Sequence, residues 1–157
     1  MGYKTVTIQP TLSTDAYADN DVLFNPTKIP DACTFNGGSK LCSVSITDTS
    51  ANRTPMKLCF FQLGTYNIGS INATVNISDA NFLANVPLGY IDVSAAKYSA
   101  TNDIDNATLA SAMTGGIDLV LSPAANSADI FVASIVQGGT PTYAADSLKF
   151  IFGFELK

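Results

Sequence analysis

The last ten residues of this 157-residue chain constrain its fold more than any other segment. Phenylalanines stand at every second position, Phe150, Phe152 and Phe154, between Leu148 and Leu156. Because successive side chains of a β-strand point to opposite sides, these five residues share one face. The pattern predicts a strand with one strongly apolar face, which must be buried against another layer of the protein.

Two earlier segments alternate in the same way and are predicted to be half-buried strands. They run from Lys4 to Ile8 and from Leu41 to Asp48. The expected inward residues are Val6 and Ile8 in the first segment and Cys42, Val44 and Ile46 in the second. Further strand candidates are Val22–Phe24, Ala32–Phe35, Tyr90–Val93 and Ile117–Leu121. Together these segments predict roughly eight or nine strands.

Two of the expected strands are covered on both faces, because Met56–Leu63 and Ile130–Val136 are apolar at nearly every position. Two kinds of cover are possible for the second face. Either loops of the same chain lie over it, or a neighbouring subunit does.

The composition favours strands over helices throughout the chain. Glu, Gln, Lys and Arg together number 12, whereas Val, Ile and Thr number 37. We therefore expect an all-β fold, a two-sheet antiparallel sandwich with jelly-roll or Greek-key wiring, with a closed barrel as the alternative. One short helix is expected near residues 78–84, where Ser78 can cap the first turn. Residues 1–157 are expected to form a single domain.

Composition also argues against catalysis and against several classes of partner. The chain has no histidine, and Glu155 is its only glutamate, so we expect no enzymatic activity and no cofactor. The net charge of −5 disfavours nucleic acid and anionic lipid surfaces. No apolar run is long enough to span a bilayer, and residues 1–5 lack the apolar core of a secretion signal. Neither membrane insertion nor export is therefore expected.

The three cysteines, Cys33, Cys42 and Cys59, are expected to be free. A two-residue turn centred on Gly37 and Gly38 would set Cys33 opposite Cys42 on neighbouring strands, where a disulfide is conceivable. The odd count and the inward side of the strand pattern favour small buried thiols instead. Without histidine or a Cys-x-x-Cys pair, a zinc site is not expected.

Aspartates gather at two places, Asp15–Asp21 and Asp103–Asp105, where oxygen ligands for calcium could converge. Neither cluster has the spacing of an EF-hand. Because Asp and Asn also bond their own backbone in turns, we interpret both clusters as structural and predict no metal site. An aspartate pair that hydrolyses sugars stays a minor alternative.

A series of strand and turn motifs runs along nearly the whole chain. In the N-terminal part it comprises Thr5–Leu12, Asp15–Ala18 and Asp21–Phe24. In the later part it comprises Gly37-Gly38 before Leu41 and Ser43-Val44, then Phe60-Phe61, Ile77–Ala80 and Gly139–Tyr143. Taken together, these motifs resemble a family of small β-rich structural proteins encoded by tailed bacteriophages.

The resemblance implies a virion structural protein, an outer capsid decoration or cement protein that binds and stabilises the lattice of the major capsid protein. It places the protein on the capsid exterior after synthesis in the host cytoplasm. The symmetry axes of an icosahedral shell favour a homo-oligomer, with a trimer preferred to a dimer. The alternative is a tail or fibre module that recognises carbohydrate, although the chain has no tryptophan to stack on a sugar.

Four residues are candidates for binding a partner: Tyr3 in the N-terminal strand, Tyr66 beyond the aromatic strand, and Pro141 with Tyr143 in the last turn. Tyrosine is enriched at the hot spots of protein interfaces. The alternative for each tyrosine is packing at the rim of its own core. Residues 1–9 could also add a strand to the exposed sheet edge of a neighbour.

Overall fold

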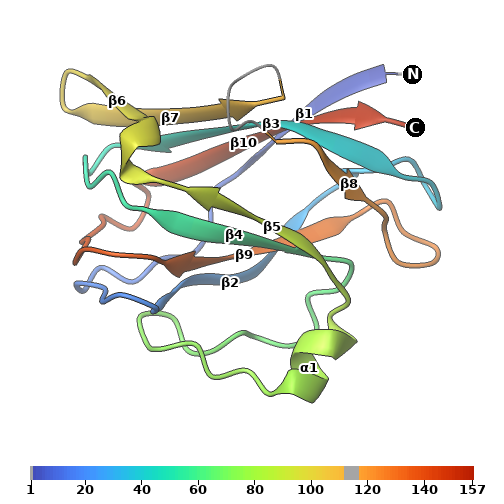
Figure 1. Ribbon diagram of the computed structural model, residues 1–157, viewed down its shortest axis with the longest axis horizontal. Coiled ribbons are helices and arrows are strands. Elements are labelled where there is room, and N and C mark those ends of the chain that lie inside the picture. The colour runs from blue at the N-terminus through green and yellow to red at the C-terminus, as the bar shows by residue number, and fades with distance from the viewer. Residues whose placement is uncertain (1, 112–116) are drawn as a thin grey trace.

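The computed structural model describes residues 2–111 and 117–157 of the chain, and the features below belong to these residues. Two antiparallel sheets pack face to face (Figure 1). The first sheet contains β1 (Gly2–Ile8), β10 (Leu148–Leu156), β3 (Ser39–Asp48), β7 (Ile104–Ala110) and β6 (Tyr98–Thr101), with β8 (Leu119–Leu121) also paired to β3. The second sheet contains β2 (Val22–Ile29), β9 (Ile130–Val136), β4 (Met56–Phe61) and β5 (Pro87–Val93).

The strand pairs are nested inside one another along the chain. β4 pairs with β5, β3 with β7 and β8, β2 with β9, and β1 with β10, all antiparallel. Two further pairs, β10 with β3 and β9 with β4, join the nested pairs within each sheet. A long hairpin that rolls up in this way is a jelly roll. The predicted two-sheet antiparallel sandwich is confirmed, and the sheets do not close into the alternative barrel.

The C-terminal phenylalanines fill the space between the two sheets. β10 lies in the first sheet between β1 and β3, and Phe150, Phe152 and Phe154 are at most 1% exposed. Phe150 and Phe152 stack with ring centroids 6.0 Å apart. From the opposite sheet, Phe24 meets Phe150 and Phe60 meets Phe152 edge-to-face, at 5.4 and 5.9 Å. The prediction of a half-buried strand at Leu148–Leu156 is therefore confirmed.

The strands predicted to be covered on both faces are covered on the outside by their own chain. The connection from β4 to β5, residues 62–86, returns across the outer face of the second sheet and contains α1 (Asp79–Ala84). Beneath it, Phe61 packs edge-to-face on Phe82 with ring centroids 5.4 Å apart, in a second apolar cluster. Residues 62–86 thus provide the same-chain cover, although they leave part of the outer face exposed.

The predicted short helix is present. The Ser78 hydroxyl accepts a hydrogen bond from the Asn81 amide at 3.3 Å, and Asp79 lies in the first turn, where its charge suits the helix dipole. A single 3-10 turn, η1 (Ala95–Lys97), precedes β6. No helix in the described part of the chain has the length and hydropathy needed to cross a membrane.

The predicted position of Cys33 opposite Cys42 on neighbouring strands is wrong. β2 and β3 belong to different sheets, so no hairpin joins them, and neither Gly37 nor Gly38 has the positive φ that a two-residue turn requires. The predicted strand Ala32–Phe35 is a loop, in which the Cys33 amide donates to the Ala128 carbonyl at 2.9 Å. All three cysteines are free, as predicted.

The predicted inward position of Cys42 is also wrong. A β-bulge shifts the register here, so that Phe154 lies opposite Leu41 while Gly153 lies opposite Ser43. The extra residue turns Leu41 into the core and leaves Cys42 half-buried outside it. Gly153 fits the bulge because a Cβ there would collide with the Ser43 hydroxyl.

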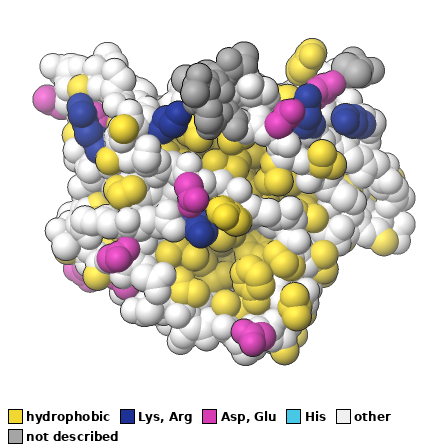
Figure 2. Space-filling view, in the orientation of Figure 1, with side chains coloured by type: hydrophobic (Ala, Val, Ile, Leu, Met, Phe, Trp, Pro, Cys, Tyr) yellow, Lys and Arg dark blue, Asp and Glu magenta, His cyan; other side chains and the backbone are white. Residues whose placement is uncertain are grey.

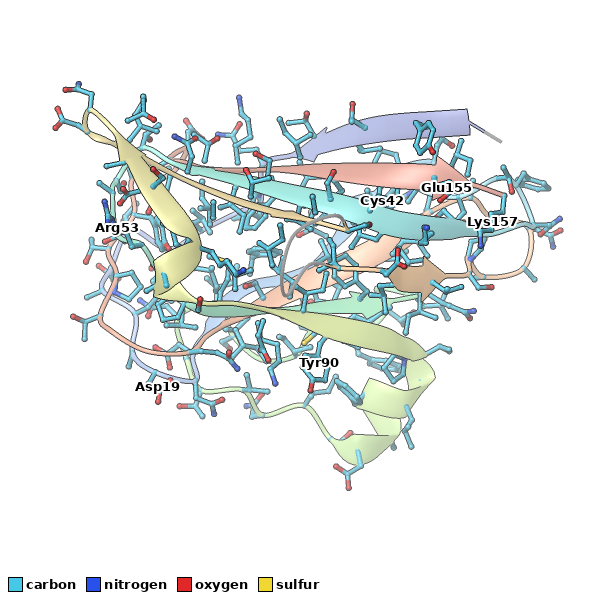
Figure 3. The ribbon with its side chains drawn as sticks, turned by 45° about the horizontal axis from the view of Figure 1, so that its top comes forward. Asp19, Cys42, Arg53, Tyr90, Glu155 and Lys157 are labelled. Atoms are coloured by element: carbon cyan, nitrogen blue, oxygen red, sulfur yellow. The ribbon has the colours of Figure 1, made fainter. Side chains whose placement is uncertain are left out.

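A buried polar cluster closes one end of the sandwich, at the side where Figure 3 labels Arg53. The Tyr98 hydroxyl donates to the Thr54 carbonyl at 2.9 Å, and the Tyr143 hydroxyl donates to the Thr54 hydroxyl. The Asp48 carboxylate, 1% exposed, accepts hydrogen bonds from the Ser50 and Asn52 amides at 2.8 Å each. These bonds satisfy groups that would otherwise be costly to bury.

The phenylalanine stack gives a first test of the fold. Phe152→Ala is expected to lower the free energy of unfolding by about 3–5 kcal/mol, because it removes a fully buried ring and leaves a cavity. Lys149→Ala, on the outward face of the same strand, should change it by about 0.5 kcal/mol or less. Urea unfolding of both variants measures the difference, and similar values for the two would contradict the assignment of the faces.

Burial raises the pKa of Asp48, a shift that the amides of Asn52 and Ser50 partly oppose and the nearby charge of Asp105 reinforces. A carboxyl group with a raised pKa binds its proton more tightly in the folded chain. The stability that it contributes is present below its unfolded pKa, near 3.8, and is lost as the pH rises through the folded value. Asp48→Asn should flatten this part of the pH profile of unfolding, whereas Asp19→Asn, at an exposed position, should leave it intact. Parallel profiles for Asp48→Asn and the wild type would refute the argument.

Candidate functional site

The four residues predicted to bind a partner do not come together. Tyr3 is 80% exposed on β1, and Tyr66 is 39% exposed in the connection after β4, where its amide donates to the Asn85 side chain at 3.0 Å. Tyr143 is only 2% exposed, and Pro141 is buried, with its carbonyl accepting from the Tyr17 amide at 2.9 Å. In this conformation Tyr3 and Tyr66 offer side-chain surface, whereas Tyr143 and Pro141 belong to the interior.

One aspartate of each predicted cluster has a structural partner. Asp21 accepts a hydrogen bond from the Ala18 amide at 2.8 Å within its own loop. Asp105 lies 3.1 Å from the guanidinium Nε of Arg53 and is 3% exposed. Among the described residues, no group of three or more acidic, cysteine or histidine side chains is arranged to hold a metal ion.

An apolar hollow of about 350 Å³ lies on the outer face of the second sheet, beside the cover formed by residues 62–86. We call it the outer hollow. Its lining includes Cys59, Phe61, Phe82, Pro87, Tyr90 and Ile135. Figure 2 shows the hydrophobic side chains that gather over this part of the molecule.

The strand register explains why the outer hollow exists. Across the sheet, Cys59 pairs with Tyr90 on one side and with Ala133 on the other, so the row has one large side chain and two small ones. The rows on either side carry the larger Phe61 and Ile135. Small residues between large ones leave a depression.

Tyr90 forms the wall of the outer hollow at the free edge of the sheet. Tyr90 is 60% exposed, and its ring projects from β5 away from the sandwich, as Figure 3 shows. The Lys57 ammonium lies 4.3 Å from the ring centroid, in a cation–π contact, and 4.0 Å from the Asp92 carboxylate. Lys57 and Asp92 therefore hold the position of the ring from the neighbouring row.

A second hollow, of about 300 Å³, opens between the two sheets on the other side of Tyr90. We call it the edge hollow. β5 contributes Tyr90, Ile91 and Asp92 to its lining. The first sheet contributes Leu109 of β7 and Leu119 of β8, and the segment just before β8 contributes Ile117 and Asp118. The sheets meet closely beside it, since a Cβ on Gly89, whose φ is +147°, would lie 2.7 Å from a methyl group of Leu119.

The chemistry of the outer hollow is that of binding. Burial raises the pKa of the Cys59 thiol to about 11, and the nearby Lys57 only partly opposes the shift. The nucleophilic thiolate is therefore scarce at neutral pH. What remains is apolar surface with an exposed aromatic ring and one flanking ion pair, which suits the side chains of a partner.

Sequence reasoning missed this surface, although part of its signal was present. The predicted strand Tyr90–Val93 alternates, which puts Tyr90 and Asp92 on the face opposite Ile91. The pairing with Lys57 and Cys59 on β4 and the position of β5 at a sheet edge depend on tertiary structure.

Comparison with known proteins adds little to these observations. Neither a protein-family model nor a curated protein matches the sequence. A solved structure of tomato aspermy virus aligns over 98% of this chain and 75% of its own, with 11% identity and a TM-score of 0.37. One of desmodium yellow mottle tymovirus aligns over 98% and 85%, with 11% identity and a TM-score of 0.28. The K3 adhesin domain of Lys-gingipain from Porphyromonas gingivalis aligns over 78% and 59%, with 13% identity and a TM-score of 0.29. At TM-scores this low, these alignments do not establish a function for this chain.

The exposed ring and the buried ring beside it should differ in their importance for folding. Tyr90→Ala is expected to lower the free energy of unfolding by about 1 kcal/mol or less, because it removes an exposed ring and one exposed cation–π contact. Phe61→Ala, at a fully buried position in the same hollow, should cost about 3–5 kcal/mol. Urea unfolding compares them, and an equally large loss for Tyr90→Ala would mean that the ring serves the fold.

Proposed function

We propose that this chain is a virion structural protein that acts by adhesion, as an outer capsid decoration or cement protein bound to the major capsid protein. The observation that carries the proposal is the incompletely covered apolar surface around Tyr90, on a sandwich whose own core is already filled. The similarity of its strand and turn motifs to tailed-phage structural proteins supports the viral setting. The acidic net charge of −5 suits a position outside the DNA-filled interior.

A decoration protein strengthens a shell by adding buried contact area across the lines along which capsid subunits separate. A few well-packed anchors supply most of the binding free energy of such an interface. Tyr90, half-surrounded by apolar side chains and held by Lys57, has the properties of such an anchor. Tyr3 and Tyr66 are exposed and stay secondary candidates.

The proposal includes an assembly and a location. We propose a homo-oligomer on the capsid exterior, a trimer in preference to a dimer, because icosahedral shells present twofold and threefold positions. Synthesis then takes place in the host cytoplasm.

One observation favours a second candidate function, a carbohydrate-recognising module of the tail or fibre. An exposed tyrosine ring such as Tyr90 can stack on the apolar face of a sugar. However, the Lys57 ammonium already lies over the ring, which restricts stacking to the other face. Specific binding on a glycan array, lost in Tyr90→Ala, would favour this function over capsid decoration.

The test is association with the particles of the virus that encodes the chain. Mass spectrometry should detect the protein in purified virions, and recombinant protein should co-sediment with capsids that lack it. Tyr90→Ala should weaken co-sedimentation about tenfold or more, as expected for a hot-spot residue. Lys149→Ala, on the opposite sheet, serves as the matched control and should bind normally. Virions that contain none of the protein would refute the proposal.

A further inference from the structure

Within residues 2–111 and 117–157, one side of the β5 backbone has no strand partner. β5 ends the second sheet, in the order β2-β9-β4-β5, and its partner there is β4. An edge strand of this kind carries a row of amides and carbonyls on which another chain can form a further strand. Such strand addition draws affinity from the main chain and specificity from pockets for alternate side chains.

The other sheet edges of the described residues are less suited to strand addition. β8, which pairs with β3 beside β7, is only three residues long. β2 carries Pro26, which lacks an amide, in its interior, whereas the proline of β5, Pro87, is the first residue of its strand. The pairing of β2 with β9 has two register shifts, and the pairing of β5 with β4 has one. β6 is only four residues long. β1 is longer, but neither hollow borders it. β5 borders both hollows, and Tyr90 contributes to the lining of each.

The two hollows match the alternation of an added strand. Side chains of a strand beside β5 would point in turn toward the edge hollow, between the sheets, and toward the outer face next to Tyr90. The lining of the edge hollow is mixed. Its apolar side chains, Ile91, Leu109, Ile117 and Leu119, can contact an apolar residue, and Asp92 and Asp118 add polar surface beside them. The side chain that points to the outer face next to Tyr90 should be longer, so that it can reach the exposed charged groups at the edge of the hollow.

The charges at the rim favour a basic partner. Asp92 and Asp118 both line the edge hollow, and their side chains are 57% and 65% exposed. The two nearby lysines are less exposed, at 30% for Lys57 and 28% for Lys40, and Lys40 also pairs with Glu155 at 3.0 Å. Three carboxylates, those of Asp92, Asp118 and Glu155, therefore share the two ammonium groups of Lys57 and Lys40. Asp92 and Asp118 are more exposed than the lysines that pair with them.

We propose that the free edge of β5 binds an extended segment of the partner protein, in which an apolar residue enters the edge hollow and a neighbouring lysine or arginine meets Asp92 and Asp118. This inference rests on the proposed function and specifies how the capsid protein is recognised. The bound segment of the partner forms a further β-strand on β5. The interface therefore combines main-chain hydrogen bonds with one apolar and one charged side-chain contact.

Hydrogen exchange distinguishes strand addition from contact between side chains alone. The test compares the free recombinant protein with the same protein bound to capsids that were purified without it. In the bound protein, the amides of residues 88–93 should exchange more slowly by about fivefold or more. Residues 2–8 on β1 provide the internal comparison and should exchange at unchanged rates. Capsid binding with unchanged exchange at residues 88–93 would overturn the inference and leave the proposed function intact. Failure of the wild-type protein to bind capsids at all would overturn both.

A peptide array tests the charge requirement separately. The probe is a set of overlapping twelve-residue peptides covering the major capsid protein of the same virus. The chain should bind peptides that place an apolar residue next to a lysine or arginine, and the double variant Asp92→Lys, Asp118→Lys should bind them about tenfold or more weakly. Asp79→Lys, at an exposed position on α1, is the matched control, and circular dichroism checks that each variant is folded. Equal binding by the double variant and the control would contradict the proposed role of the two carboxylates.

Discussion

The packing of β10 against the opposite sheet is the interaction on which the rest of the structure depends. Three phenylalanines in alternate positions need apolar partners along the whole strand, and Phe24 and Phe60 provide two of them from the second sheet. Because β10 lies between β1 and β3, both neighbouring strands are fixed in register by the same stack. The strands pair in a nested order, which places β1 and β10 side by side in the first sheet. This nested order is the jelly-roll wiring.

Much of the fold could be predicted from sequence because several strands show an alternation of apolar and polar residues that is visible within a short segment. Val6, Ile8, Val44 and Ile46 all face the core, as their spacing indicates. The errors arise where tertiary structure overrides that pattern. The bulge at Cys42 depends on its pairing with β10, and the loop at Ala32–Phe35 lies where the chain passes from one sheet to the other. The hairpin of β6 and β7 was missed because its inward residues include a buried aspartate, Asp105, that an apolar pattern cannot reveal.

The candidate site was harder to predict than the fold for a similar reason. Its depth comes from Cys59 and Ala133, two small residues far apart in sequence that the register sets side by side. The spacing of residues within either strand does not predict this contact between Cys59 and Ala133. The candidates chosen from sequence were tyrosines near turns, and burial separates them: Tyr143 bonds Thr54 inside the protein, whereas Tyr3 stands in solvent.

The pairing of β1 with β10 has a consequence for how the chain could be rewired. Gly2 lies opposite Leu156, and both ends emerge at the same corner of the molecule in Figure 1. A short linker there would turn the most distant strand pair into a local hairpin, and new ends could be opened in an exposed loop elsewhere. Such a circular permutant would keep every strand neighbour while reducing the loop-closure entropy that the native connectivity must overcome to bring its first and last strands together.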